Sequence, residues 1–291
     1  MDGILILDKP KGMTSHDCVN KARRAFNTRK VGHSGTLDPE ASGVLVLAIN
    51  RATRILEFLN QDDKAYLFSV LFNRTTDTLD HTGEVTQEIL HAPLDGLDDV
   101  TQTFIGTYDQ SPPAYSAVKV KGKKLYEYAR EGKPIPHVPK RRITVHALSR
   151  ISEVKSEGGV HETAFEVHAS KGLYVRKLAS DIAKALGTVA HTTSIRRLQA
   201  GLFTLERSVT LETLQEGTAE LLTMNEALAH IPQVCVDDET EKALKDGKKV
   251  ALKADAPTVR LVKGDTLLAL YEKETDGIYR ARKVLAQGGA S

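Results

Sequence analysis

A glycine-rich segment with the sequence GHSGTLDP, at residues 32–39, holds two side chains suited to chemistry. Asp38 can serve as a nucleophile or base, and His33 as a base or a stacking group. Segments that connect the elements of a rigid scaffold are favoured places for such groups. An aspartate before a proline is more often a turn residue, and a loop histidine is often a hydrogen-bonded structural group. Alone, these two residues leave both explanations open.

The same segment nearly matches the GxSxG turn that presents the nucleophile of serine hydrolases. Its fifth position is Thr36 rather than glycine, and no strong strand pattern precedes Gly32. A triad of Ser34, Asp181 and His191 would have the required order along the chain, but nothing in the sequence selects these residues. A serine hydrolase is therefore a weak alternative.

Two further candidate segments contain tyrosines, SKGLYVR at 170–176 and KAY at 64–66. The strand-like start of the first predicts that Tyr174 and Arg176, two positions apart, point to the same face of a strand. A guanidinium can bind a carboxylate through two hydrogen bonds, and a tyrosine beside it can stack or hydrogen-bond. An ordinary salt bridge at Arg176 and a core or rim position for Tyr66 are the structural alternatives.

The N-terminal part of the chain predicts the elements that would hold these segments. GILILDKP is typical of a short strand ended by a turn, and Thr14 or Ser15 is suited to cap a helix that runs to about Phe26. The glycine-rich segment, taken as VGHSGTLDPEASG at 31–43, favours a loop. It leads into VLVLAI, an apolar run typical of a buried strand, and residues 51–59 have a helical pattern.

Strand and helix patterns follow one another without regular alternation in the rest of the chain, which favours an α+β fold over a doubly wound parallel sheet. Strand patterns begin at Tyr66 and recur at FEVHAS, and helical spacing follows Tyr174. Between them, residues 111–142 predict a long exposed excursion that is rich in proline, tyrosine and basic residues, with a helix near 125–130.

Short apolar segments separated by turn signals fill the end of the chain, after a short helix that ends before Asp246 and Gly247. TVRLV, TLLALYEK and GIYRARKVL have the spacing of a small β-barrel-like module. We therefore expect two domains, residues 1–232 and 233–291.

The composition of the 291-residue chain narrows the class of protein. Hydrophobic residues make up 41%, enough for a substantial core, which disfavours wholesale disorder. No apolar stretch approaches the ~18 residues of a membrane span, and the start of the chain has no signal-peptide pattern. The two cysteines, Cys18 and Cys235, form no CxxC pair, which disfavours a disulfide framework or a cysteine zinc site. We expect a cytoplasmic protein that does not bind a membrane.

Charge is segregated along the chain although its net value is only +2. Residues 9–30 contain seven Lys or Arg and one acid, and residues 119–142 contain nine and two. Acids gather elsewhere, as at residues 84–99. This pattern suits a polyanionic partner, but two solvated surface faces would produce it equally well.

Six segments, taken together, resemble a known family. In order they are DKPKGMTSHD at 8–17, GHSGTLDPEASGVL at 32–45, KAY at 64–66, SPPAYSAVKVKGKKLYEYAR at 111–130, SKGLYVRKLA at 170–179 and IRRL at 195–198. Their order and spacing resemble those of bacterial tRNA pseudouridine synthases of the TruB type, which convert the T-loop uridine at tRNA position 55. The resemblance spans about residues 3–210, and the C-terminal segment more loosely resembles a PUA module.

The resemblance implies a mixed, mainly antiparallel sheet flanked by helices, and a site built around Asp38. Asp38 matches the family's essential aspartate, and Arg176 the arginine that pairs with it. Tyr66 matches the tyrosine that packs on the target base and is proposed to take part in proton transfer. Tyr174, in the same Tyr-x-Arg motif as Arg176, is expected to support the site.

Other matched positions are expected around this centre. His33 matches the histidine that fills the space left by the flipped nucleotide, Ile195 stands where leucine is usual under the base, and Lys9 belongs to a motif packed near the site. The resemblance also implies tRNA contacts by basic residues of the excursion: Lys119, Lys121, Lys123, Lys124, Arg130, Lys140, Arg141 and Arg142.

The implied reaction breaks the N1–C1′ bond of uridine, turns the uracil and rejoins it through C5. It is an isomerisation, so no cofactor and no metal are expected. The carboxylate can attack C1′ or C6, or remove the 2′ proton, and the sequence leaves these routes open. The expected partner is the T arm of tRNA, with no protein partner and a monomeric chain. The alternative function is a tRNA-binding or tRNA-folding factor that acts mainly without catalysis.

Overall fold

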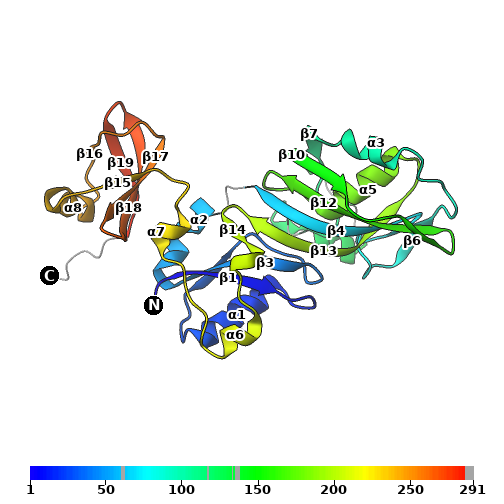
Figure 1. Ribbon diagram of the computed structural model, residues 1–291, viewed down its shortest axis with the longest axis horizontal. Coiled ribbons are helices and arrows are strands. Elements are labelled where there is room, and N and C mark those ends of the chain that lie inside the picture. Colours follow the sequence, from blue (N-terminus) through cyan, green and yellow to red (C-terminus); the bar gives the residue numbers. More distant parts are fainter. Residues whose placement is uncertain (60–62, 117, 133, 135–137, 286–291) are drawn as a thin grey trace.

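The computed structural model describes residues 1–59, 63–116, 118–132, 134 and 138–285. A large sheet with helices packed against it occupies most of the molecule, and a smaller sheet lies at its C-terminal end (Figure 1). The predicted α+β class is confirmed, because the strands of the large sheet are mixed with helices in no regular order.

The large sheet is mixed and mainly antiparallel, as expected. Its main path is β1 (Gly3–Lys9), β3 (Ser42–Ile49), β13 (Ala190–Ala200), β4 (Lys64–Phe72), β12 (Val160–Ala169), β10 (Arg141–Arg150) and β7 (Gly106–Gln110). Three short strands pair beside this path: β2 (Val31–Ser34) with β3, β11 (Lys155–Glu157) with β12, and β14 (Phe203–Thr204) with β13. Along the main path β3 and β13 pair in parallel, and the other neighbours are antiparallel.

The helices are α1 (Ser15–Ala25), η1 (Asn50–Ile55), α2 (Leu56–Leu59), α3 (Leu97–Gln102), α4 (Leu125–Arg130), α5 (Val175–Ala185), η2 (Leu205–Arg207), α6 (Leu211–Gln215), α7 (Met224–Ala227) and α8 (Asp238–Lys245). Some of the helices pack against the large sheet, whereas α4 lies in the excursion and α8 in the C-terminal module. Two hairpins are formed by β5 (Arg74–Thr76) with β6 (Val85–Glu88), and by β8 (Lys119–Val120) with β9 (Lys123–Lys124).

The helix predicted from Thr14 is confirmed as α1. The Thr14 side chain accepts a hydrogen bond from the backbone of Asp17, and the Asp17 carboxylate accepts one from the backbone of Thr14, which completes a capping box. Buried Cys18, Val19 and Ala22 form its apolar face. The predicted buried strand VLVLAI is confirmed within β3, all eight residues of which are buried.

Two predictions about the candidate segments are wrong. The predicted loop at 31–43 begins with β2, because Val31–Ser34 completes a ladder with β3 that its short sequence does not reveal. Tyr174 and Arg176 do not share the face of a strand, since α5 begins at Val175 with Tyr174 as its N-cap. Buried Val175, Leu178, Ala179 and Ile182 give this segment helical spacing from its first residue, and that face packs into the main core.

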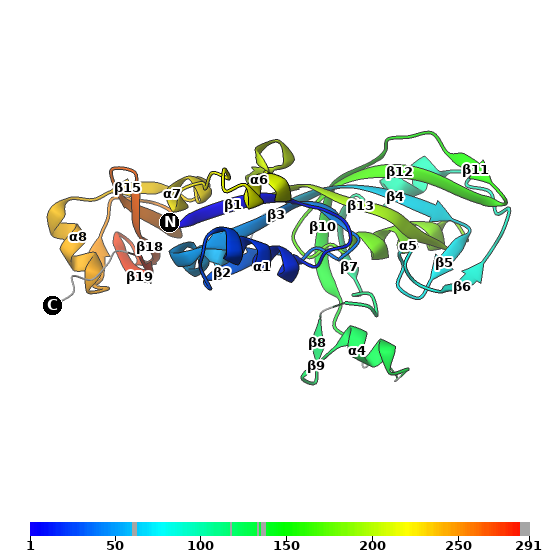
Figure 2. The ribbon, with the colours of Figure 1, turned by 90° about the horizontal axis from the view of Figure 1, so that it is seen from below.

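The predicted excursion is confirmed as a projection from the sheet. Figure 2 shows β8, β9 and α4 extending away from the layer of strands below β7 and β10. The predicted helix near 125–130 is α4. Residues 117, 133 and 135–137 of the excursion lie outside the described residues.

The predicted C-terminal module is a five-stranded sheet in the order β15 (Gln233–Cys235), β17 (Thr258–Lys263), β18 (Thr266–Thr275), β19 (Ile278–Val284) and β16 (Val250–Ala251). One hydrophobic cluster joins it to the large sheet, because Val262, Leu267 and Leu270 pack with Ile4 and Ile6. Residues 286–291 of the module lie outside the described residues.

Candidate active site

A cavity of about 700 Å³ lies between the segment around Asp38 and the start of α5. The structure brings seven of the sequence-predicted residues to its wall. They are Asp38, Tyr66, Tyr174, Arg176, Ile195, Arg141 and Arg142, and Lys64 lines the wall as well. They come from the loop after β2, from the adjacent strands β4 and β13, from β10 and from the first turn of α5, so the fold closes one site from distant parts of the sequence.

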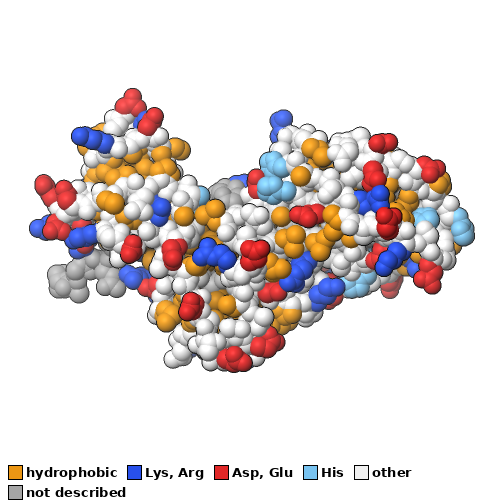
Figure 3. Space-filling model, viewed as in Figure 1, with side chains coloured by type: hydrophobic (Ala, Val, Ile, Leu, Met, Phe, Trp, Pro, Cys, Tyr) orange, Lys and Arg blue, Asp and Glu red, His pale blue; other side chains and the backbone are white. Residues whose placement is uncertain are grey.

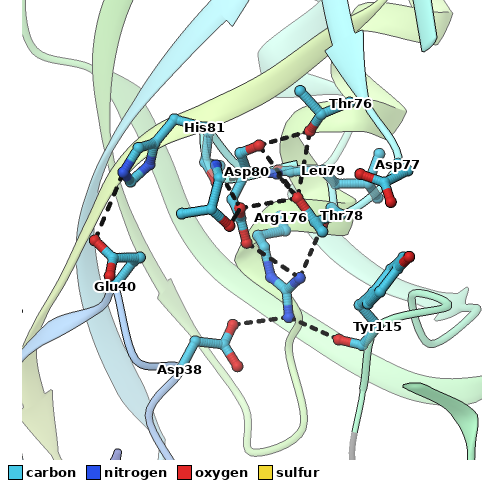
Figure 4. A network of polar contacts seen from close by, with 12 residues as sticks. Asp38, Glu40, Thr76, Asp77, Thr78, Leu79, Asp80, His81, Tyr115 and Arg176 are labelled. Atoms are coloured by element: carbon cyan, nitrogen blue, oxygen red, sulfur yellow. Dashed lines mark hydrogen bonds and ion pairs between the residues drawn. The ribbon is translucent and has the colours of Figure 1, made fainter. Parts of the chain in front are cut away.

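Asp38 and Arg176 form an ion pair at this cavity. The Nη2 atom of Arg176 lies 2.8 Å from Oδ2 of Asp38 (Figure 4). The guanidinium side chain is only 7% exposed, whereas the side chain of Asp38 is 45% exposed. The arginine is therefore a fixed part of the wall, and the carboxylate keeps an open side toward the cavity.

The guanidinium is held by three other groups besides Asp38. Nη2 also donates to the carbonyl of Tyr115 at 3.0 Å, while Nη1 donates to the carbonyl of Thr78 at 2.7 Å and lies 3.4 Å from Oδ2 of Asp80 (Figure 4). A guanidinium has five N–H donors in a rigid fork, and four acceptors here fit the two Nη groups. These contacts fix the plane of Arg176 and so the direction from which it meets Asp38.

Asp80 is a site residue that the sequence analysis missed. Its Oδ1 accepts hydrogen bonds from the backbone N–H of Thr82 at 3.0 Å and the hydroxyl of Thr78 at 2.8 Å. Burial tends to raise the pKa of Asp80, but these hydrogen bonds and the charge of Arg176 outweigh it, so the pKa is lowered. Asp80 is consequently a carboxylate at neutral pH, and Arg176 is shared between two negative charges.

We expect Asp80→Asn to lower the single-turnover rate of the expected isomerisation about tenfold. The reason is that a hydrogen bond between charged groups is worth about 1.5 kcal/mol, and a loss of that size in the transition state lowers a rate about tenfold. The amide retains an oxygen for Thr78 and Thr82 but removes the charge that faces Arg176. Asp98→Asn is the matched control, because Asp98 forms a comparable pair with Arg150 at the surface. A rate for Asp80→Asn equal to that of the control would contradict a role for Asp80 at the site.

Tyr66 and Ile195 form an apolar part of the cavity. Tyr66 is 8% exposed and lies on β4, in register with Arg197 of β13, while Ile195 is in register with Phe68. The register is regular over this stretch, between two bulges, so Tyr66 and Ile195 share one face of the sheet. A flat ring and a branched aliphatic chain that line the same cavity as Asp38 can pack against a planar base.

Tyr174 lines the cavity beside a predicted RNA-binding residue. The guanidinium carbon of Arg141 lies 5.9 Å from the centre of the Tyr174 ring, a cation–π distance. Arg141 and Arg142 are exposed and line the cavity, so the end of the basic excursion reaches the site itself.

Lys9 is placed beneath the site rather than on its wall. Its ammonium group is fully buried and donates to the carbonyls of Pro10, Met13 and Pro39 at 2.8, 2.6 and 2.9 Å. Burial lowers the pKa of Lys9, and neighbouring negative groups oppose this shift. With three hydrogen bonds to backbone oxygens, Lys9 holds the residue that follows Asp38.

A second buried side chain holds the residue that precedes Asp38. The hydroxyl of Ser15 donates to the Leu37 carbonyl at 3.1 Å and accepts from the Leu37 N–H at 2.9 Å. Lys9 and Ser15, from the N-terminal strand and helix, thus fasten the loop on both sides of the aspartate. The DKPKGMTSHD segment at 8–17 thus has a structural role, because two of its side chains hold the loop of Asp38.

His33 does not line the cavity. His33 lies on β2 and is half-buried. Burial is the main cause that lowers the pKa of its ring, and the positive charge of Arg197 lowers the pKa further. The ring is therefore neutral at neutral pH, which suits stacking better than charge attraction.

Arg197 is a further residue that the sequence analysis quoted without assigning a role. It is 1% exposed, its Nε donates to the Val44 carbonyl at 2.7 Å, and it lines the cavity. Its backbone lies so close to Gly43 that a Cβ atom there would be 2.2 Å from the Arg197 carbonyl oxygen. Glycine is thus required at position 43, where β3 pairs with β13.

The residues of the hydrolase alternative do not form a triad. Ser34 is buried, His191 makes a hydrogen bond to the carbonyl of Arg74 at 2.9 Å, and Asp181 pairs with Lys177. In the part of the chain that the structure describes, no group of three or more His, Cys, Asp or Glu side chains is arranged to hold a metal ion.

Two family models cover most of the chain. The model of the TruB family pseudouridylate synthase N-terminal domain matches residues 23–175. The chain belongs to the TruB family. The model of the tRNA pseudouridylate synthase B C-terminal domain follows at residues 176–231. The TruB resemblance of the sequence is thereby confirmed, and both members of the Asp38–Arg176 pair lie within the matched residues.

Similar proteins span nearly the full length of this TruB chain. The tRNA pseudouridine synthase B of Halalkalibacterium halodurans is 42% identical, with 98% of both chains covered. That of Syntrophotalea carbinolica is 40% identical over the whole of both chains. Among solved structures, the archaeal box H/ACA sRNP Nop10-Cbf5 complex contains a chain with a TM-score of 0.71 and 25% identity, and the match covers 97% of this chain and 85% of that one. The C-terminal sheet has the curled form of a PUA-like module.

Proposed function

We propose that this TruB-family chain converts the uridine at position 55 in the T loop of tRNA to pseudouridine, with Asp38 as the essential carboxylate. The half-exposed carboxylate of Asp38, paired at the cavity with the buried guanidinium of Arg176, carries the proposal. The names of the relatives, tRNA pseudouridine synthase B, support the substrate and the reaction.

The arrangement of side chains supports each stage of this isomerisation. Asp38 must be ionised to attack C1′ or C6, or to take the 2′ proton, and the adjacent charge of Arg176 favours the ionised form. Tyr66 and Ile195 would hold the detached uracil by packing against it. Packing contacts have no fixed direction, so the base could still turn. The final proton leaves C5 to Tyr66 or to water. The reaction is internally balanced, and no cofactor or metal takes part in the proposal.

The target uridine is stacked within folded tRNA and must be turned out to reach the cavity. Unstacking costs a few kcal/mol. A neutral, half-buried ring can offset part of this cost by filling the vacated space, and we assign this role to His33. Its place on β2, directly before the loop of Asp38, puts it next to the cavity rather than in it.

A tRNA-binding or tRNA-folding factor without catalysis is the second candidate function, favoured by the projecting basic excursion. The deciding experiment measures pseudouridine by tritium release or mass on a T-arm stem–loop and on full-length tRNA. Pseudouridine at the T-loop position supports the enzyme. RNA binding without any pseudouridine would leave only the second function.

The basic residues of the excursion are proposed to bind tRNA phosphates. Lys119, Lys121, Arg130 and Lys140 are exposed, whereas Lys123 and Lys124 are partly covered and lie over the rings of Tyr128 and Tyr126. On the face of the molecule in Figure 3, Lys and Arg are intermixed with Asp and Glu, so that face offers no continuous basic surface. The excursion, which Figure 2 shows projecting elsewhere, is the better partner for a polyanion.

Changing these four exposed residues (Lys119, Lys121, Arg130 and Lys140) to Gln is expected to weaken tRNA binding and flatten its salt dependence. Each lost phosphate contact reduces the slope of log K against log salt by about 0.7 to 0.9. The measurement is a titration of tRNA at several salt concentrations. The control changes four cations outside the excursion, Arg74, Arg150, Lys155 and Lys184, to Gln. Equal slopes in the two variants would remove the excursion from the RNA interface.

We also propose the coarse organisation of the molecule in the cell. The division into residues 1–232 and 233–291 is supported by the second family model, which ends at residue 231. The described part of the chain contains no helix long and apolar enough to cross a membrane. We propose a monomer that acts in the cytoplasm, and sedimentation of the purified chain with and without tRNA tests the monomeric state.

A further inference from the structure

Gln110 joins the strand that precedes the basic excursion to the segment that carries Arg176. It is the last residue of β7 and is only 2% exposed. Its Oε1 accepts a hydrogen bond from the backbone N–H of Tyr174 at 2.9 Å, and its Nε2 donates to the carbonyl of Tyr174 at 3.3 Å. Because a backbone N–H can only donate, this pairing also fixes which end of the amide is oxygen.

The start of α5 has no cap of its own. Tyr174 occupies the N-cap position and makes no side-chain cap hydrogen bond. In a capping box, a Glu or Gln at the third helical position accepts from the N–H of the N-cap residue. Here that position is Lys177, which has no acceptor. Gln110 supplies the missing acceptor from another strand, so the place where α5 begins depends on a contact across the fold.

Arg176 is the second residue of α5, and its guanidinium contacts the chain segment that follows Gln110. Nη2 of Arg176 donates both to Asp38 and to the carbonyl of Tyr115, five residues after Gln110. The stretch from Gln110 to Tyr115 thus makes two attachments to the start of α5. Gln110 binds the backbone of Tyr174, and the Tyr115 carbonyl binds the guanidinium of Arg176. A shift of the first turn of α5 would move the guanidinium relative to Asp38.

We propose that Gln110 is a positioning residue of the reaction, which holds the start of α5 so that Arg176 meets Asp38. The proposal rests on the proposed function. Gln110 does not line the cavity, and it acts on the carboxylate only through Tyr174 and Arg176. Its effect therefore falls on the rate of the chemical step and not on the affinity for tRNA.

The test compares single-turnover rates at saturating tRNA with tRNA dissociation constants. Gln110→Met keeps the length of the side chain and removes both hydrogen bonds to Tyr174. We expect the rate to fall about tenfold, because displacement of a catalytic group by a fraction of an ångström has effects of this size. The dissociation constant is expected to stay within twofold of the wild-type value. A rate within twofold of wild type would overturn the proposal, and so would a loss confined to affinity.

A control separates positioning from general loosening. Thr101→Val removes another buried side-chain hydrogen bond, which Thr101 donates to the Leu97 carbonyl at 2.7 Å in α3. This variant is expected to lose thermal stability and keep the wild-type rate. An equal fall in rate for Thr101→Val would overturn the proposal. Should Gln110→Met fail to fold, Gln110→Glu decides. It keeps the acceptor for the Tyr174 N–H, but its second oxygen cannot donate to the Tyr174 carbonyl and brings a negative charge against it. Its rate is expected below wild type, and an unchanged rate would overturn the proposal.

A double-mutant cycle tests the route through Arg176. If Gln110 acts by placing Arg176, Gln110→Met lowers the rate by less than twofold in an Arg176→Lys background. A full tenfold fall in that background would show that Gln110 acts by another route and would overturn the assignment. Failure of the proposed function is distinguishable, since the wild-type chain would then form no pseudouridine in the same assay.

Discussion

Asp38→Asn is expected to abolish pseudouridine formation and to leave tRNA binding within about twofold of wild type. The amide retains the size of the carboxylate and can still accept a hydrogen bond from Arg176, but it cannot attack a carbon or take a proton. Removal of the essential group of a catalytic unit costs on the order of 10⁴-fold or more in rate. The loss is measured in single turnovers with enzyme in excess over tRNA.

The control for this variant lies two residues along the same loop. Glu40→Gln also removes one negative charge, and Glu40 contacts His81 at 3.6 Å rather than Arg176. We expect near-wild-type turnover from it. If Asp38→Asn turned over as fast as Glu40→Gln, the role of Asp38 would be disproved. If Asp38→Asn lost tRNA affinity together with its activity, the fold would be damaged instead.

Arg176→Lys is expected to reduce the single-turnover rate by about 10²-fold, the effect of a displaced catalytic group. The guanidinium contacts acceptors of four residues, which are Asp38, Thr78, Asp80 and Tyr115. An ammonium group has three donors around a single point and cannot reach all four. At least one buried acceptor is left unpaired, and Asp38 loses the partner that orients it.

The matched control is Arg150→Lys. Arg150 binds both oxygens of Asp98 at 2.8 Å, and this pair is exposed at the far end of β10. Exposed ion pairs contribute about 1 kcal/mol or less, so the control is expected to have the wild-type rate and almost unchanged stability. Equal rates for the two Lys variants would show that the planar contacts of Arg176 do not matter for the reaction.

Local signals in the sequence predicted the elements whose pattern repeats within a few residues. The capping box at Thr14, the apolar run of β3 and the buried face of α1 are all visible locally, because each depends on neighbouring residues. The start of α5 was predicted wrongly as a strand. Tyr174 and Val175 have high strand propensity, and burial of the helical face at Leu178 and Ile182 overrode it.

The sequence by itself determined the loop that carries Asp38, the arginine that can pair with it, the basic excursion and the TruB resemblance, since these lie in short contiguous segments. Only the tertiary structure decided that Asp80 and Tyr115 contact Arg176, and that Gln110 hydrogen-bonds to the backbone of Tyr174. Two of the contacts of Arg176 are to backbone carbonyls, and any residue has a carbonyl, so no side-chain pattern announces them. The contact of Asp80 joins residues 96 positions apart, and only the packing of β4, β13 and α5 brings such residues together.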